Sequence, residues 1–147
     1  MDISSLRPIL DKHNVRLVGV GLGYNSLDGF MESGCWKGNE LYVDEGKDLY
    51  QALNLGKGGL KMLGDPNVKA ASVRAKKRGV VGNLKGDGMQ LGGTYIVDKN
   101  GKVLLEFQQQ AYGEHPSPES ILRALGLESE VANIPTVQKI GTGVSQA

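Results

Sequence analysis

The stretch from Gly82 to Gln110, GNLKGDGMQLGGTYIVDKNGKVLLEFQQQ, decides the fold of this 147-residue chain. Within it, residues 94–97 and 102–107 are β-branched and apolar runs, which favour strands. Residues 98–101, Asp-Lys-Asn-Gly, join the two runs, and Asn-Gly accepts the positive φ angles that a tight turn demands. The sequence therefore predicts an antiparallel β-hairpin entered through a glycine-rich segment.

The composition around this hairpin is that of a globular domain with balanced charge. Seventeen basic and 16 acidic residues leave a net charge of +1, so no global field would attract nucleic acid or anionic lipid. The start of the chain has neither the basic nor the apolar region of a secretory signal, and no apolar run is long enough to span a membrane. A single cysteine, Cys35, forms neither an internal disulfide nor a cysteine-rich metal site. We therefore expect a soluble, cytoplasmic protein that binds no nucleic acid.

Helix and strand patterns alternate on either side of the hairpin. A helix is predicted from Leu6 to Asn14 with Ser4 or Ser5 as its N-cap, and Pro118 opens a last helix over residues 119–125. The intervening segments are predicted as strands at 15–21 and 40–44 and helices at 26–32, 47–53 and 68–78. The near-continuous apolar run at 15–21 is typical of a strand buried on both faces. We expect one domain over residues 1–127 and a disordered tail over 128–147, where the periodicity ends.

This order of elements is typical of thioredoxin-like α/β domains, and five runs of sequence carry a closer resemblance. They are VRLVGVG (15–21), KGNELYVD (37–44), LYQALNL (49–55), GNLKGDGMQLGGT (82–94) and ILRALGL (121–127). In this order and spacing they resemble the peroxiredoxin-like 2 family. The resemblance implies a thioredoxin-like mixed sheet flanked by helices.

The same resemblance implies an activity and its partners. It is a cytosolic reduction of prostaglandin-type endoperoxides to the F form, with NADPH as electron donor and a thioredoxin-type reductant. In the family a strand and a Cys-x-x-Cys motif precede the helix that corresponds to residues 3–12, and a helix N-terminus lowers the pKa of such a thiol. No position of this sequence matches that motif, so no catalytic cysteine is carried over. We therefore expect an N-terminally incomplete, inactive chain, and the alternative function is an interaction module.

Two further places could carry chemistry, and each has a structural alternative. Cys35, near Lys37, is either a reactive thiol or, more often for a free cysteine, a small apolar filler. Gly92, Gly93 and Thr94 stand where the resemblance brings backbone close to the substrate, because glycine permits close approach. The alternative for these three residues is a simple strand entry.

The remaining motifs favour structural roles. Gly19-x-Gly21-x-Gly23, with Asp44 after the next strand, is reminiscent of a dinucleotide-binding turn, but Tyr24 occupies the position of the third glycine. His13 and His115 have no acidic or cysteine neighbours at ligand spacing, so no metal site is predicted. Trp36 is expected to be a packing residue.

The resemblance also predicts how the strands pair. A strand that lies between the counterparts of 15–21 and 94–97 in thioredoxin-like folds has no match here. We therefore expect one pair, 15–21 with 40–44, and a separate hairpin at 94–107. The alternative is direct pairing of 15–21 with 94–97.

Overall fold

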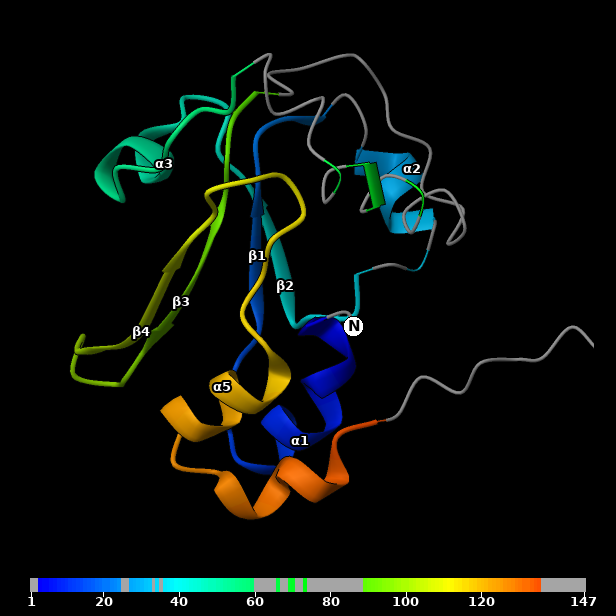
Figure 1. Ribbon diagram of the computed structural model, residues 1–147, viewed down its shortest axis with the longest axis vertical. Coiled ribbons are helices and arrows are strands. Elements are labelled where there is room, and N and C mark those ends of the chain that lie inside the picture. The colour runs from blue at the N-terminus through cyan, green and yellow to red at the C-terminus, as the bar shows by residue number, and fades with distance from the viewer. Residues whose placement is uncertain are drawn as a thin grey trace, which may run out of the picture.

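A computed structural model describes residues 3–24, 27–32, 34, 36–59, 66, 69, 70, 73 and 89–135. The described strands form two pairs, and helices α1 and α5 gather near one end of them (Figure 1). The chain is therefore an α/β protein, as the sequence predicts. Most of the helix expected over residues 68–78 lies outside the described residues.

The predicted hairpin is confirmed as strands β3 (Gly93–Val97) and β4 (Val103–Gln108), which pair antiparallel. Its turn is built as the sequence indicates, with Gly101 at a φ of +83°. The Asp98 carboxylate accepts hydrogen bonds from the backbone N–H groups of Asn100 at 2.8 Å and Lys102 at 2.9 Å. The turn therefore satisfies its own polar groups, which is why so short a stretch could be predicted.

The second strand pair is parallel and consists of β1 (Val18–Gly21) and β2 (Glu40–Val43). Helix α2 (Leu27–Glu32) lies in the connection between them, as predicted. Strand β1 begins three residues later than expected, because the Val15 N–H bonds back to the Leu10 carbonyl at 2.8 Å. The expectation that β1 is buried on both faces is wrong, since the Val18 side chain is 42% exposed.

The first helix begins differently from the prediction. A 3-10 helix, η1 (Ile3–Leu6), leads directly into α1 (Arg7–Lys12), with Pro8 within its first turn. Leu6 is the N-cap and makes no side-chain capping bond, so neither Ser4 nor Ser5 caps α1. Pro8 is tolerated because a first-turn N–H has no partner within the helix.

The core lies where α1 meets the last α-helix, α5 (Pro118–Ala124). Helix α5 begins as predicted: the Ser117 hydroxyl caps it by accepting from the Ser120 N–H at 3.1 Å. Leu6 and Leu122 are fully buried, and Ile96 of β3 packs against them. One end of the hairpin therefore joins the helical core.

The first residues of the tail expected from residue 128 are ordered in the structure. Residues Glu128–Asn133 form a 3-10 helix, η4, and Glu130 within it is only 5% exposed. The Glu130 carboxylate bonds to Lys12 at 2.6 Å, to His13 at 2.8 Å and to Asn133 at 2.7 Å. These contacts with α1 and the residue after it hold η4 in place. Residues 136–147 lie outside the described part of the chain.

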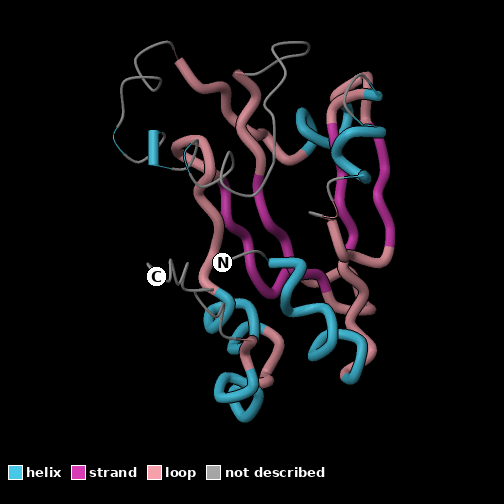
Figure 2. Tube along the Cα trace, turned by 90° about the vertical axis from the view of Figure 1, so that its right-hand side faces the viewer, coloured by secondary structure: helices cyan, strands magenta, loops and turns pink. Residues whose placement is uncertain are grey.

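The two strand pairs do not join into one sheet in the described part of the chain. Strand β1 pairs only with β2, and β3 only with β4, so the expected separation is observed and direct pairing of β1 with β3 is not. Figure 2 draws the strands in magenta, and the two pairs lie apart from each other. No described helix has the length and apolar character that a membrane crossing requires.

Candidate functional site

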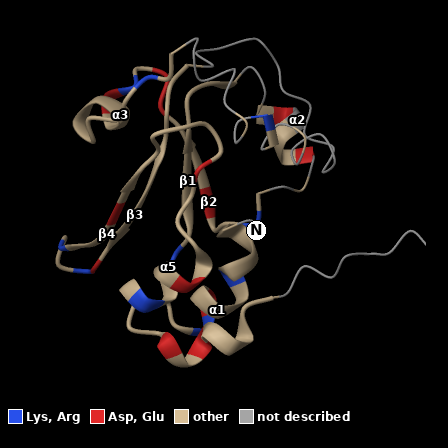
Figure 3. Cartoon of the chain, viewed as in Figure 1, with Lys and Arg blue, Asp and Glu red and all other residues tan. Residues whose placement is uncertain are grey.

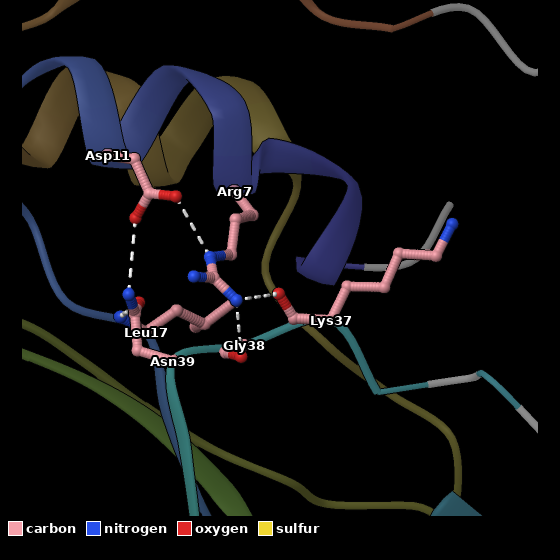
Figure 4. Close-up of polar contacts among 6 residues, drawn as sticks. All are labelled: Arg7, Asp11, Leu17, Lys37, Gly38 and Asn39. Atoms are coloured by element: carbon pink, nitrogen blue, oxygen red, sulfur yellow. Dashed lines mark hydrogen bonds and ion pairs between the residues drawn. The ribbon is translucent and has the colours of Figure 1, made fainter. Parts of the chain in front are cut away.

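Arg7 ties α1 to the segment that leads into β2. Its Nε donates to Asp11 at 2.9 Å, one turn along the helix. Its Nη1 donates to two backbone carbonyls, those of Lys37 at 3.0 Å and Gly38 at 2.7 Å (Figure 4). One guanidinium thus fixes the first turn of α1 against a segment 30 positions away. The sequence analysis missed this role, because nothing near Arg7 in sequence indicates it.

Asn39 completes the same network from the other side. Its amide nitrogen donates to Asp11 at 3.2 Å, and its side-chain oxygen accepts from the Leu17 N–H at 2.7 Å. The hydrogen bond from Asn39, followed by that from Arg7, lowers the pKa of the Asp11 carboxyl. Asp11 therefore remains a carboxylate that joins two donors, and the approach to β1 is held against α1.

Trp36 is a packing residue, as expected, and its indole lies against two glycines. A Cβ at Gly38 would be only 2.0 Å from Trp36 Cζ2, and a Cβ at Gly19 would be 2.9 Å from Cη2. Glycine at both positions lets the ring approach the backbone closely. Cys35, the preceding residue, lies outside the described residues, so its proposed reactivity stays a prediction.

The hairpin entry holds the three residues predicted to contact substrate. Both backbone groups of Gly92 are occupied by Gln109: the N–H donates to its side-chain oxygen at 2.7 Å, and the carbonyl accepts from its N–H at 3.0 Å. Bonding alternates along an antiparallel ladder, so Thr94 also turns toward β4 and Gly93 turns away. Of the three, only Gly93 therefore directs its backbone N–H and C=O away from the hairpin. Substrate contact here stays a prediction.

Helix α3 (Asp48–Ala52) and the residues after it lie against this entry. Gln108 donates to the Leu53 carbonyl at 3.1 Å, and a Cβ at Gly93 would be 3.1 Å from Leu55. The Gln90 side chain donates to the Gly56 carbonyl at 2.9 Å. These glutamines join α3 to the hairpin and were not singled out by the sequence analysis, since their partners lie more than 30 positions away.

Two motifs weighed in the sequence have structural roles here. The Asp44 carboxylate accepts from the N–H groups of Asp48 at 3.0 Å and Leu49 at 2.9 Å, so it caps the first turn of α3. Gly19 and Gly21 lie within β1 itself and form no turn after it. Both observations oppose the dinucleotide-binding interpretation.

The charges of the described residues are mixed in sign (Figure 3), and no cluster of metal ligands is found among them. No group of three or more acidic, histidine or cysteine side chains is placed to hold a metal within the described ranges. Figure 3 shows acidic and basic residues interspersed along the described elements.

The amino-acid sequence of this chain is similar to those of known proteins. Residues 2–111 match the AhpC/TSA antioxidant enzyme family. The chain is 44% identical over 136 residues to the prostamide/prostaglandin F synthase of Bos taurus, a match that covers 88% of this chain and 67% of that protein. The proteins of the same name from Homo sapiens and Danio rerio are 43% and 36% identical over 136 and 140 residues, covering 88% of this chain and 68% and 67% of theirs. No solved structure was found to match significantly.

Proposed function

Because this chain belongs to the AhpC/TSA antioxidant enzyme family, a thioredoxin-like family, we propose that it serves in the reduction of lipid endoperoxides. The family match and the names of the relatives support an oxidoreductase-like role. The narrower proposal is that the substrate is a prostaglandin-type endoperoxide reduced to the F form. The observation that carries it is the identity of 44% over 88% of the chain to a prostamide/prostaglandin F synthase.

The proposed chemistry needs two sulfur atoms. A thiolate attacks one oxygen of the endoperoxide, the O–O bond breaks, and the other oxygen leaves as an alkoxide that takes a proton. A second thiol then attacks the sulfur of the resulting S–O bond, which releases the second hydroxyl and leaves a disulfide. We propose that a thioredoxin-type reductant restores the thiols with electrons from NADPH.

This sequence contains one cysteine, Cys35, and so supplies at most one of the two sulfurs. We therefore expect the 147-residue chain by itself to give no turnover, and to act as the scaffold that holds substrate.

The test follows NADPH oxidation with thioredoxin, thioredoxin reductase and a prostaglandin endoperoxide, with the bovine relative as the positive control. The expected result is turnover by the relative and none by this chain. Turnover that disappears in Cys35→Ser would overturn the expectation and make Cys35 the nucleophile. Turnover that survives the substitution would exclude thiol chemistry.

Binding is tested separately from turnover. Trp36 is the only tryptophan, so its fluorescence can follow titration with a non-reactive endoperoxide analogue. Saturable binding with competition by the natural endoperoxide is expected. Failure of both ligands to bind the folded chain would contradict the substrate proposal.

A further inference from the structure

Helix η4 is held at the end of α1 by a carboxylate that is almost completely shielded from water. The Glu130 side chain is only 7% exposed, whereas that of Lys12, one of its partners, is 64% exposed. The Lys12 Nζ and the Glu130 Oε1 lie 2.6 Å apart, although 118 positions of sequence separate the two residues. Figure 1 draws η4 in orange beside the end of α1. An accessible positive charge on α1 therefore compensates a buried negative charge on η4.

The other two partners of Glu130 do not replace Lys12. The His13 Nε2 lies 2.8 Å from the same carboxylate oxygen, and the Asn133 amide donates to the other oxygen at 2.7 Å. The hydrogen bond from Lys12 contributes most to the lowering of the Glu130 pKa to about 2, ahead of the bonds from His13 and Asn133. Glu130 is therefore a carboxylate at neutral pH. Its negative charge remains when the charge on Lys12 is removed, because the other two bonds still lower its pKa.

The position of η4 also depends on apolar contacts. Leu127 before η4, Val131 within it and Ile134 after it pack against the core that contains Leu10 and Leu122. A 3-10 helix of six residues has little stability of its own, because its hydrogen bonds have poor geometry. Its place therefore depends on this packing and on the ion pair with α1. Displacement of η4 would uncover part of the core.

We propose that Lys12 is a site of acylation, and that its acylation releases η4 from α1. The deprotonated Lys12 amine attacks the carbonyl carbon of a thioester acyl donor, and the C–S bond breaks. The thiolate leaves and takes up the proton that the nitrogen loses. The product is an uncharged amide with a single N–H in place of three donors. The buried carboxylate then lacks its lysine partner, and a buried charge that loses its partner is strongly destabilising.

The expected consequence is regulation of the lifetime of the protein. In the closed state Glu130 is only 5% exposed, so a protease that recognises glutamate cannot reach it. A protease cleaves such a segment at a rate set by how often the segment opens. Acylation of Lys12 would therefore make the peptide bonds of η4 cleavable while the strands remain folded. This inference goes beyond redox chemistry and does not depend on it.

The direct test uses the full chain with acetyl-lysine incorporated at position 12. A glutamate-specific protease is added, and mass spectrometry follows cleavage within η4, after Glu128 or Glu130, and within β4, after Glu106. We expect cleavage within η4 to become roughly 5- to 50-fold faster, since a hydrogen bond between charged groups is lost but water partly screens the exposed lysine. An unchanged rate would overturn the proposal. Cleavage after Glu106 as fast as that within η4 would also overturn it, because the whole chain would then be opening.

Matched variants separate the charge of Lys12 from its shape. Lys12→Gln is neutral and should behave like the acetylated chain, whereas Lys12→Arg keeps the charge and should behave like the parent. Acetyl-lysine in place of Lys102, an exposed residue beside the hairpin turn, should leave cleavage within η4 unchanged. Equal acceleration by modification at either lysine would contradict the assigned role of Lys12.

Two further measurements test the route of the effect and the access to the lysine. In Glu130→Gln the carboxylate is gone, so acetylation of Lys12 should no longer accelerate cleavage after Glu128. A full acceleration in that background would show that the acetyl group acts in another way, and the proposal would be wrong. The unmodified chain is also incubated with acetyl-coenzyme A as the thioester. We expect acetylation of both Lys12 and Lys102, and modification of Lys102 without any at Lys12 would overturn the assigned site.

Discussion

Substitution of Gly38 by alanine tests how tightly the segment before β2 is packed. The added Cβ would lie 2.0 Å from Trp36 Cζ2 and 2.5 Å from Cε2, whereas carbon atoms in contact are about 3.5–4.0 Å apart. The indole must therefore retreat by roughly 1.5–2 Å, and forcing an extra carbon into a packed site costs about 1–3 kcal/mol. We expect Gly38→Ala to lower the free energy of unfolding by an amount in this range.

The measurement is urea unfolding followed by the emission of Trp36, the only tryptophan in the chain. The folded variant should also emit at longer wavelength than the parent, because the displaced ring is more exposed to water. Gly21→Ala is the matched control: its added carbon would meet nothing closer than the Tyr42 carbonyl at 3.9 Å. If the two variants unfold at the same urea concentration and Trp36 emission is unchanged, the packing argument is refuted.

Three further substitutions test other contacts. Leu122→Ala, at a fully buried core position, should cost about 2–5 kcal/mol in urea unfolding, and a loss below 1 kcal/mol would contradict its core role. The bonds from Lys12 and His13 lower the pKa of Glu130 to about 2, so its stabilising effect is fully present above the ordinary carboxyl pKa of 4.5 and is lost as pH falls toward 2. The melting temperature of Glu130→Gln should therefore lie below the parent's at pH 7, and the difference should shrink on acidification; a constant difference would exclude this linkage. Gly93→Ala would place a carbon 2.8 Å from the Phe107 carbonyl and should destabilise the hairpin, whereas Gly92→Ala meets only the flexible Gln109 side chain and should not, as judged by thermal melting.

The local sequence was enough to predict those elements whose hydrogen bonds join residues only a few positions apart. The 98–101 turn satisfies its groups through Asp98, and α5 begins at its Ser117 cap, so both were predicted correctly. The start of β1 was placed too early, because Asn14 adopts a φ of +57° and the Val15 N–H returns to α1. The hydrophobic periodicity of the sequence does not indicate that the chain bonds back to α1 at this point.

Contacts between segments that are distant in the sequence could not be predicted from local sequence patterns. The residues of η4 were expected to be disordered because their short polar sequence shows no periodicity. They are ordered because the Glu130 carboxylate bonds to Lys12, a lysine 118 positions earlier. The Arg7 network likewise depends on carbonyls 30 and 31 positions away. The separation of the strand pairs was predicted, but from the family resemblance and from no single residue. For the candidate site, the sequence indicated Gly92, Gly93 and Thr94, whose contact with substrate stays a prediction, while the structure added the glutamines that join α3 to this entry.

The helical core has a consequence for how the protein folds. Its members come from both ends of the described chain, since α1 packs on α5, and Lys12 meets Glu130 across 118 positions. Closing so long a loop costs entropy before any contact repays it, and a high share of distant contacts slows folding. During synthesis α1 must therefore wait for α5 and η4 to leave the ribosome, while the valine-rich strands made in between are already exposed. This interval is when the chain is most open to aggregation or to capture by a chaperone.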